Sequence, residues 1–203
     1  MRKWMAPMIA AMLLAGCNAN DGGNVATGDS DNRIAMAADA NVSAADGEAV
    51  SGAQIQLAPD GIGYVYPDGR IGRAAFGTGK NISSQMAVAA LGDPIGDTVN
   101  SECGAGPLEI VDYQGNFSML YQDGRFVGWT LGGDDSLLTT ASGIGIGSTR
   151  SEMADTLVVT MVPESTLGSE FMIGDSQMGG LLNGNDADAI VTDLWAGTTC
   201  MFR

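Results

Sequence analysis

The sequence contains no histidine. This absence excludes serine–histidine and cysteine–histidine nucleophile pairs, imidazole general bases and most zinc or copper sites. Two carboxylates could still catalyse hydrolysis, but many acidic residues stand in turn sequences, such as Asp60-Gly61 and Asp68-Gly69. We therefore predict no catalytic residue, no cofactor and no metal site. The alternative that stays open is a histidine-free, carboxylate-dependent hydrolase that acts on cell-envelope polymer, because any two acids could meet in the fold.

Positive charge is also scarce, with 9 basic residues against 24 acidic ones. Nucleic acid is excluded as a partner, because a phosphate backbone is bound by clustered Lys and Arg and the sequence has no such cluster. The formal net charge of −15 indicates a solvated surface that could attract a basic partner or divalent cations.

The sequence lacks an apolar run long enough to span a bilayer as a permanent helix. Its candidate run, at 6–15, follows a short basic stretch that contains Arg2 and Lys3. This is the layout of a secretory signal peptide, which we predict over 1–16. Removal of the signal peptide would leave seven basic residues and a formal charge of −17.

The signal peptide ends at Leu14-Ala15-Gly16-Cys17, a tetrapeptide that resembles the lipobox of bacterial lipoproteins. The resemblance implies that Cys17 carries lipid and becomes the first mature residue. Acyl chains would hold the protein at a membrane, since each buried methylene contributes ~0.8 kcal/mol. The next residue is Asn18 and not Asp, which by the sorting rule of enterobacterial lipoproteins implies the outer membrane, with the protein facing the periplasm.

A flexible acidic tether is predicted to follow the lipid. Residues 18–50 are rich in Ala, Asn, Asp, Gly and Ser and contain no aromatic residue. Such a composition buries too little apolar surface to offset the entropy of ordering the chain. We therefore divide this part of the protein into a signal peptide at 1–16 and a lipidated N-terminus with its tether at 17–50.

Two cysteines remain besides Cys17, namely Cys103 and Cys200. An even pair in an oxidising compartment predicts a disulfide between them. For a loop of about 100 residues, the chain-entropy model gives a contribution of ~4.7 kcal/mol. The alternative for Cys103 is a catalytic thiolate, which we disfavour because the sequence has no histidine to activate it.

The remaining residues, 51–203, are predicted to form a folded α+β region. Aromatic and branched residues separated by glycine-containing turns are typical of antiparallel strands. We expect an N-terminal hairpin from 54–57 and 63–66, a meander from 108–113, 117–121 and 125–131, and further strands at 169–173, 189–195 and 199–202.

Two stretches, 83–91 and 151–159, have the pattern of short helices instead. The second places Met153, Leu157 and Met161 at four-residue steps, on one face of a helix. Both stretches are preceded by the pattern G-x-G, polar residues and S-[QE]-M. The chain therefore indicates two copies of one helix-then-meander unit, with the N-terminal hairpin added.

These units, at about 51–135 and 136–203, resemble a known group of proteins. Gly79 to Met86 is followed by Leu91-Gly92-Asp93-Pro94, and Gly147 to Met153 is followed only by Val162-Pro163. This organisation resembles the tandem helix and antiparallel-sheet modules of the beta-lactamase-inhibitor-protein-like group, which includes small outer-membrane assembly lipoproteins. The resemblance implies a protein that binds other proteins through its sheet face or loops.

The segment GIGIGSTRSEM, residues 143–153, could be a phosphate cradle or a backbone bend. A dinucleotide fingerprint needs G-x-G-x-x-G after a buried parallel strand, and a Walker loop needs a lysine; the segment has neither. Thr149 and Glu152 instead fit the S/T-x-x-E capping box of a helix start. We predict a strand-to-helix bend without nucleotide, and we disfavour a nucleotide-dependent dehydrogenase.

Two other features have both a structural and a functional interpretation. Residues 183–188 resemble a calcium loop, but Ala187 stands at the fifth place and no glutamate closes the loop, so we predict a turn. Trp129 and Trp195 stand at equivalent places in the two units; we predict core anchors, with partner contact as the alternative. The sequence as a whole predicts a lipid-anchored, non-enzymatic protein of the outer membrane that binds another protein or maintains the envelope.

Overall fold

The computed structural model describes residues 54–134 and 136–200, which form an α+β fold of two helices and mostly antiparallel strands. The predicted α+β class is therefore confirmed. These residues belong to one unit, Ala45–Arg203. The predicted signal peptide, the predicted lipidation site at Cys17 and the predicted tether lie outside the described residues.

A four-stranded sheet contains the first three strands and one short later strand. Its order is β3-β2-β1-β8, in which the first three are antiparallel and β8 pairs in parallel with β1. The bounds are β1 (Gln54–Ala58), β2 (Gly61–Val65), β3 (Ile71–Ala75) and β8 (Thr139–Thr140). The expected hairpin is confirmed, and β3 extends it to a three-stranded meander.

The second sheet has eight strands, in the order β4-β5-β6-β7-β12-β11-β10-β9. The bounds are β4 (Gly96–Asn100), β5 (Leu108–Tyr113), β6 (Phe117–Gln122), β7 (Arg125–Gly132), β9 (Val159–Met161), β10 (Ser169–Ile173), β11 (Met178–Leu182) and β12 (Val191–Gly197). The predicted central meander corresponds to β5, β6 and β7. The last strands of the two meanders, β7 and β12, pair at the middle of the sheet.

Left-handed turn residues fix the register of the central meander. Asp123 (φ 50°) and Gly124 (φ 71°) form the two-residue turn between β6 and β7, and Gly115 (φ 75°) and Asn116 (φ 55°) lie in the turn before β6. Asn, Asp and Gly adopt positive φ at the lowest cost, so they allow tight hairpins whose twist matches that of the strands.

The two helices are α1 (Lys80–Leu91) and α2 (Arg150–Thr156). The prediction of a helix over 151–159 is wrong at its end, because Leu157 is already extended (φ −133°, ψ 153°). The branched residues that follow favour a strand, and β9 pairs with β10. Met161 therefore lies opposite Phe171 in the sheet and not on a helix face.

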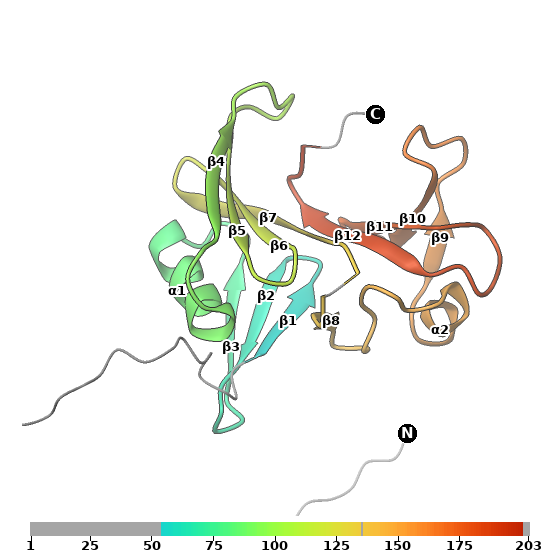
Figure 1. The fold of residues 1–203 in the computed structure, drawn as a ribbon, viewed down its shortest axis with the longest axis horizontal. Helices are drawn as coiled ribbons and strands as arrows, with labels where there is room; N and C mark the ends of the chain where they lie inside the picture. Colours follow the sequence, from blue (N-terminus) through green and yellow to red (C-terminus); the bar gives the residue numbers. More distant parts are fainter. Residues whose placement is uncertain (1–53, 135, 201–203) are drawn as a thin grey trace, which may run out of the picture. The chain divides into compact units, whose positions relative to one another are not determined.

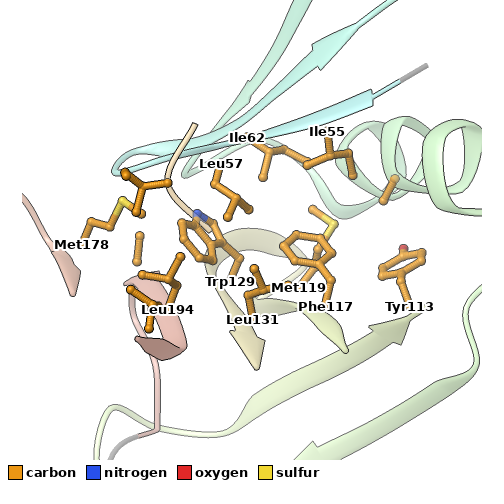
Figure 2. Packing of buried hydrophobic residues seen from close by; sticks show 14 of the residues in the cluster. Ile55, Leu57, Ile62, Tyr113, Phe117, Met119, Trp129, Leu131, Met178 and Leu194 are labelled. Atoms are coloured by element: carbon orange, nitrogen blue, oxygen red, sulfur yellow. The ribbon is translucent and has the colours of Figure 1, made fainter. Parts of the chain in front are cut away.

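The main core lies on one side of the eight-stranded sheet. A register row of residues at most 2% exposed crosses the central strands on this side: Tyr113, Phe117, Leu131 and Leu194. Figure 2 shows Ile55 and Leu57 of β1 on the opposite side of this core, with Trp129 between them and the larger sheet. The two sheets thus bury each other's apolar faces.

The helices and the smaller sheet share one side of the larger sheet. In Figure 1, α1, α2 and the four-stranded sheet lie below it, whereas the β4–β5 and β9–β10 connections extend above it. The strand predicted over 199–202 is wrong for Thr199 and Cys200, which follow β12 as irregular chain. The end of that prediction lies outside the described residues.

Candidate functional site

The second side of the eight-stranded sheet faces away from the core. A register row on this side takes one residue from each strand: Gly96, Asp112, Ser118, Thr130, Trp195, Gly179, Met172 and Thr160. Successive side chains of a strand point to opposite sides, so this row is the counterpart of the core row. We name this side the open face and define it by its half-buried residues: Ile110, Asp112, Ser118, Thr130, Asp193, Leu181 and Met172.

The charges of the open face are all negative, because two of its seven residues are aspartates and none is basic. Ser118 Oγ donates a hydrogen bond to Asp112 Oδ1 (2.6 Å). Thr192 Oγ1 donates to Asp193 Oδ2 (2.8 Å). Each carboxylate is therefore oriented by a neighbouring hydroxyl. Ser118 and Thr130 lie on the strands between the two aspartates, and Leu181 and Met172 lie on the strands beyond Asp193.

The predicted cysteine pair lies at one border of the open face. Cys103, in the β4–β5 connection, packs with Leu108 and Leu120, and Cys200 packs against this small cluster. A hydrogen bond with the Cys103 side chain raises the pKa of the Cys200 thiol. Both are free thiols in this structure, so the bridge between them stays a prediction, while their proximity is a finding.

The β9–β10 connection forms the other border. Glu170, which is 1% exposed, belongs to the open-face side of β10 and accepts a hydrogen bond from Ser165 Oγ (2.6 Å). The Val162 amide donates to the Glu170 carbonyl (2.9 Å). Each end of the open face is therefore bordered by a connection that is attached to the sheet.

The two tryptophans lie on opposite sides of the sheet, so the prediction that they occupy equivalent places is wrong. Trp129 is fully buried in the core, and its Nε1 donates to the carbonyl oxygens of Ala58 and Gly61, both at 3.0 Å. Trp195, 3% exposed, pairs with Thr130 on the other side. Neither ring is accessible enough for the alternative prediction of partner contact, and Trp129 is an anchor between the sheets.

The glycine-rich segment before α2 is a bend whose amides are already occupied. The Gly145 amide donates to Ser148 Oγ (3.1 Å), and the Gly147 amide donates to the Val191 carbonyl (2.8 Å). Gly143 (φ 79°) and Gly147 (φ 84°) adopt the left-handed conformation that the bend requires. A phosphate cradle needs converging free amides, and here one of these amides closes the bend on itself and the other attaches it to β12.

The predicted capping box is present at the start of α2. The Glu152 amide donates to Thr149 Oγ1 (3.2 Å), and the Thr149 amide donates to Glu152 Oε2 (2.7 Å). The Thr149 amide and the Thr149 hydroxyl both donate to the Glu152 carboxylate, and these two hydrogen bonds hold the pKa of Glu152 below its usual value. The pair therefore serves the helix start.

Lys80 lies between two carboxylates at the start of α1. Its Nζ contacts Glu109 and lies 3.5 Å from Asp97 Oδ2. It also lies 5.4 Å from the centroid of the Tyr121 ring. The Lys80 ammonium lies between the two acids and offsets one of their two negative charges, so the three groups form an ion-pair cluster.

Two pockets in the described part of the chain each contain a single carboxylate. One has a volume of about 350 Å³ and includes Asp112, and the other has a volume of about 380 Å³ and includes Asp175. A carboxylate-dependent hydrolase needs two acids on either side of the scissile bond. These pockets therefore do not favour that alternative.

The segment that resembles a calcium loop is a turn closed by its own groups. Asn183 Oδ1 accepts a hydrogen bond from the Ile190 amide (2.9 Å), and the Asp186 carbonyl accepts one from Ala189 (3.2 Å). Within 54–134 and 136–200, no group of three or more potential metal-ligating side chains was found. Neither of the helices seen in these residues has the length and apolarity to cross a bilayer.

Compared with known proteins, the chain matches no family model, no curated protein and no solved structure. The resemblance to the beta-lactamase-inhibitor-protein-like group therefore stays a prediction from the motifs.

The open face is the feature that sequence reasoning did not identify. Its signal is present in the alternation Phe117-Ser118-Met119 and Trp129-Thr130-Leu131, where a small polar residue stands between two large apolar ones. Such alternation indicates a sheet with one side in the core and the other toward solvent. The residues of β11, which supplies Leu181 to the open face, show no comparable alternation in the sequence.

Proposed function

We propose that this chain is a lipid-anchored protein of the bacterial outer membrane that faces the periplasm and binds another protein without catalysing a reaction. The open face is the observation that carries this proposal. Its apolar side chains Ile110, Leu181 and Met172 are half-buried, although the equivalent positions on the other side of the sheet form the core. A sheet face with partly exposed apolar residues can bury them against a partner.

Charge favours a partner with a basic surface. The open face includes Asp112 and Asp193 and no basic residue, and the chain has a formal net charge of −15. Complementary charge speeds association and excludes other acidic proteins. A partner with Lys or Arg beside apolar residues therefore fits this face.

The proposed anchor rests on Leu14-Ala15-Gly16-Cys17, and it is independent of the open face. Lipid on Cys17 would hold the protein at the membrane, and the predicted tether over 17–50 would let the folded region reach a partner. Envelope maintenance, through such a contact, is the physiological role that we propose.

We also infer that the fold contains two copies of one unit. The order α1-β4-β5-β6-β7 and the order α2-β9-β10-β11-β12 are both a helix followed by four strands. The sheet places β4 and β9 at its two edges and β7 beside β12, as expected if the units are related by a two-fold axis. The opposite orientation of Trp129 and Trp195 shows that such copies would have diverged in their side-chain pattern.

Photocrosslinking in the native envelope tests the binding proposal. A photoreactive phenylalanine analogue replaces Leu181 or Ile110 on the open face, and a matched control replaces the exposed Ala89 of α1 on the other side of the sheet. Specific adducts from the open face that Ala89 does not give would support the proposal, and adding Asp193→Lys should weaken them. Adducts that are absent, or equal at all three positions, would contradict it.

Membrane fractionation tests the anchor separately. The Cys17→Ser variant should leave the membrane fraction, while its open face stays able to bind the partner. If the variant fractionates with membranes as the wild type does, lipid anchoring is wrong, but the binding proposal is unaffected.

A further inference from the structure

A pocket of about 380 Å³ lies between the four-stranded sheet and the turn that joins β10 to β11. Its walls come from four regions of the chain: β1 and the residue after it, Arg73 of β3, the segment around Ala141, and residues between Leu157 and Met178. This pocket does not belong to the open face, since Leu57 and Met178 are members of the main core. Its volume is within the range of small-molecule sites.

The inner wall of the pocket is apolar, and the polar residues of the lining include Gln56, Thr140, Ser142 and Ser176 besides the charged residues described below. Leu57 and Met178 are each 2% exposed, and Leu157 and Ile173 are half-buried residues that pack against the same core. The pocket is therefore a place where the core has an opening to solvent. A ligand that covers these side chains would be stabilised by the removal of their apolar surface from water.

Local hydrogen bonds keep the rim of the pocket in place. The Gly174 amide donates to the Val158 carbonyl (2.7 Å), and the Met178 amide donates to Ser176 Oγ (3.2 Å), which fixes the β10–β11 turn. On the other side, the carbonyl of Ala58 accepts from Trp129 Nε1 (3.0 Å). A site that is already formed loses little entropy when a ligand binds.

The charges at the rim indicate which ligands fit. Arg73 is the only basic residue of the lining, and its guanidinium forms an ion pair with Asp60. Asp175 is the only acidic residue of the lining. An anionic ligand would have to compete with Asp60 for Arg73, and a cationic ligand would find one exposed carboxylate, so neither charge is favoured.

We propose that this pocket binds a small, uncharged, apolar molecule. The proposal is independent of the protein-binding function, because it involves residues on the other side of the larger sheet. It adds a ligand site to a chain for which we otherwise propose a surface contact.

Titration with N-phenyl-1-naphthylamine, an uncharged apolar fluorophore, tests the proposal. The protein is the full mature chain with Cys17→Ser, so that no acyl chain competes for the dye. Ala141→Trp should fill the mouth of the pocket from its exposed rim, and Ala105→Trp, in the β4–β5 connection outside the lining, is the matched control. We expect Ala141→Trp to weaken binding by at least about tenfold, whereas Ala105→Trp stays within about twofold of the parent.

Three results would overturn the proposal: no saturable binding by the parent, equal binding by Ala141→Trp, or loss of binding in Arg73→Gln. The last result would show that binding of even an uncharged dye depends on the Arg73 guanidinium, so that apolar contact alone does not make the site. Thermal unfolding of each variant checks the fold, and Ser142→Trp, also at the exposed rim, replaces Ala141→Trp if that variant unfolds.

Discussion

Phe117 and Ser118 are neighbours in β6, yet they belong to two different environments. Phe117 lies in the core row and is fully buried, whereas Ser118 lies on the open face and orients Asp112. The same contrast separates Leu131 from Thr130 in the next strand. One sheet therefore supplies stability from one side, and the other side is left free to carry the proposed binding surface.

The largest expected effect comes from replacing these two neighbours in turn. Phe117→Ala should lower the free energy of unfolding by ~3–5 kcal/mol, because it removes a buried ring and leaves a cavity. Ser118→Ala should cost about 1 kcal/mol or less, since it removes one part-buried hydrogen bond. Urea denaturation of the full chain measures both values, and similar losses at the two positions would show that the open face is packed as tightly as the core.

The border of the open face is expected to add more stability than the open face itself, because the predicted disulfide between Cys103 and Cys200 lies there. If Cys103 and Cys200 form the predicted disulfide, Cys200→Ser should cost ~2–5 kcal/mol in the oxidised protein. Reductant should then destabilise the wild type and leave Cys200→Ser unchanged. Mass spectrometry after thiol labelling of the unfolded, unreduced protein gives the direct answer: labels on both cysteines would contradict the bridge.

The core row was more predictable from the sequence than the strands around it. Strands β5, β6 and β7 combine aromatic and branched residues with glycine turns, and each of these signals is local. Strand β11 contains Gly179 and Gly180, which weaken a strand in isolation. In the fold these glycines are needed, since a side chain at Gly180 would collide with Phe171 and with the backbone of Asp193.

Local sequence signals also fail to predict where α2 ends and where the proposed ligand pocket lies, because both depend on tertiary contacts. The periodicity of Met153, Leu157 and Met161 indicates a helix, but pairing of β9 with β10 overrides it after Thr156. The pocket joins segments that only the tertiary fold brings together, so no local pattern could predict it. Tertiary contacts decided the structure wherever the local signal was weak or short.

Substitution of the two tryptophans should have the next smaller effect on the free energy of unfolding. It compares the two sides of the sheet directly, because Trp129 lies on the core side and Trp195 on the other side. Trp129→Phe removes the donor to Ala58 and Gly61, whereas the structure records no hydrogen bond from the Trp195 indole to a described residue. Trp129→Phe should therefore be more destabilising than Trp195→Phe by ~1–2 kcal/mol. Urea denaturation of both variants measures the difference, and equal losses would mean that the bond to the β1–β2 turn adds no stability.

Tyr113 is an imperfect member of the core row, because its buried hydroxyl makes no hydrogen bond of normal geometry with a described residue, although the Tyr121 side chain is close enough to influence its pKa. Figure 2 shows this residue at the α1 end of the row. Removing an unsatisfied buried group while keeping the ring should raise the free energy of unfolding by about 1 kcal/mol. Tyr113→Phe should therefore be stabilising at neutral pH, and a loss of stability would mean that the hydroxyl does find a partner.

The same hydroxyl should make the core side, but not the open face, sensitive to alkaline pH. Burial raises the pKa of Tyr113, so at a pH above about 10 the unfolded chain loses this proton while the folded chain keeps it. Stability is then unaffected below that pH and falls as the pH rises through the interval between the unfolded and folded pKa values. Tyr113→Phe should show a shallower decline in unfolding free energy between about pH 9 and pH 11 than the wild type, and Ser118→Ala should decline as the wild type does. If Tyr113→Phe keeps the wild-type slope, ionisation of this hydroxyl does not distinguish the two sides of the sheet.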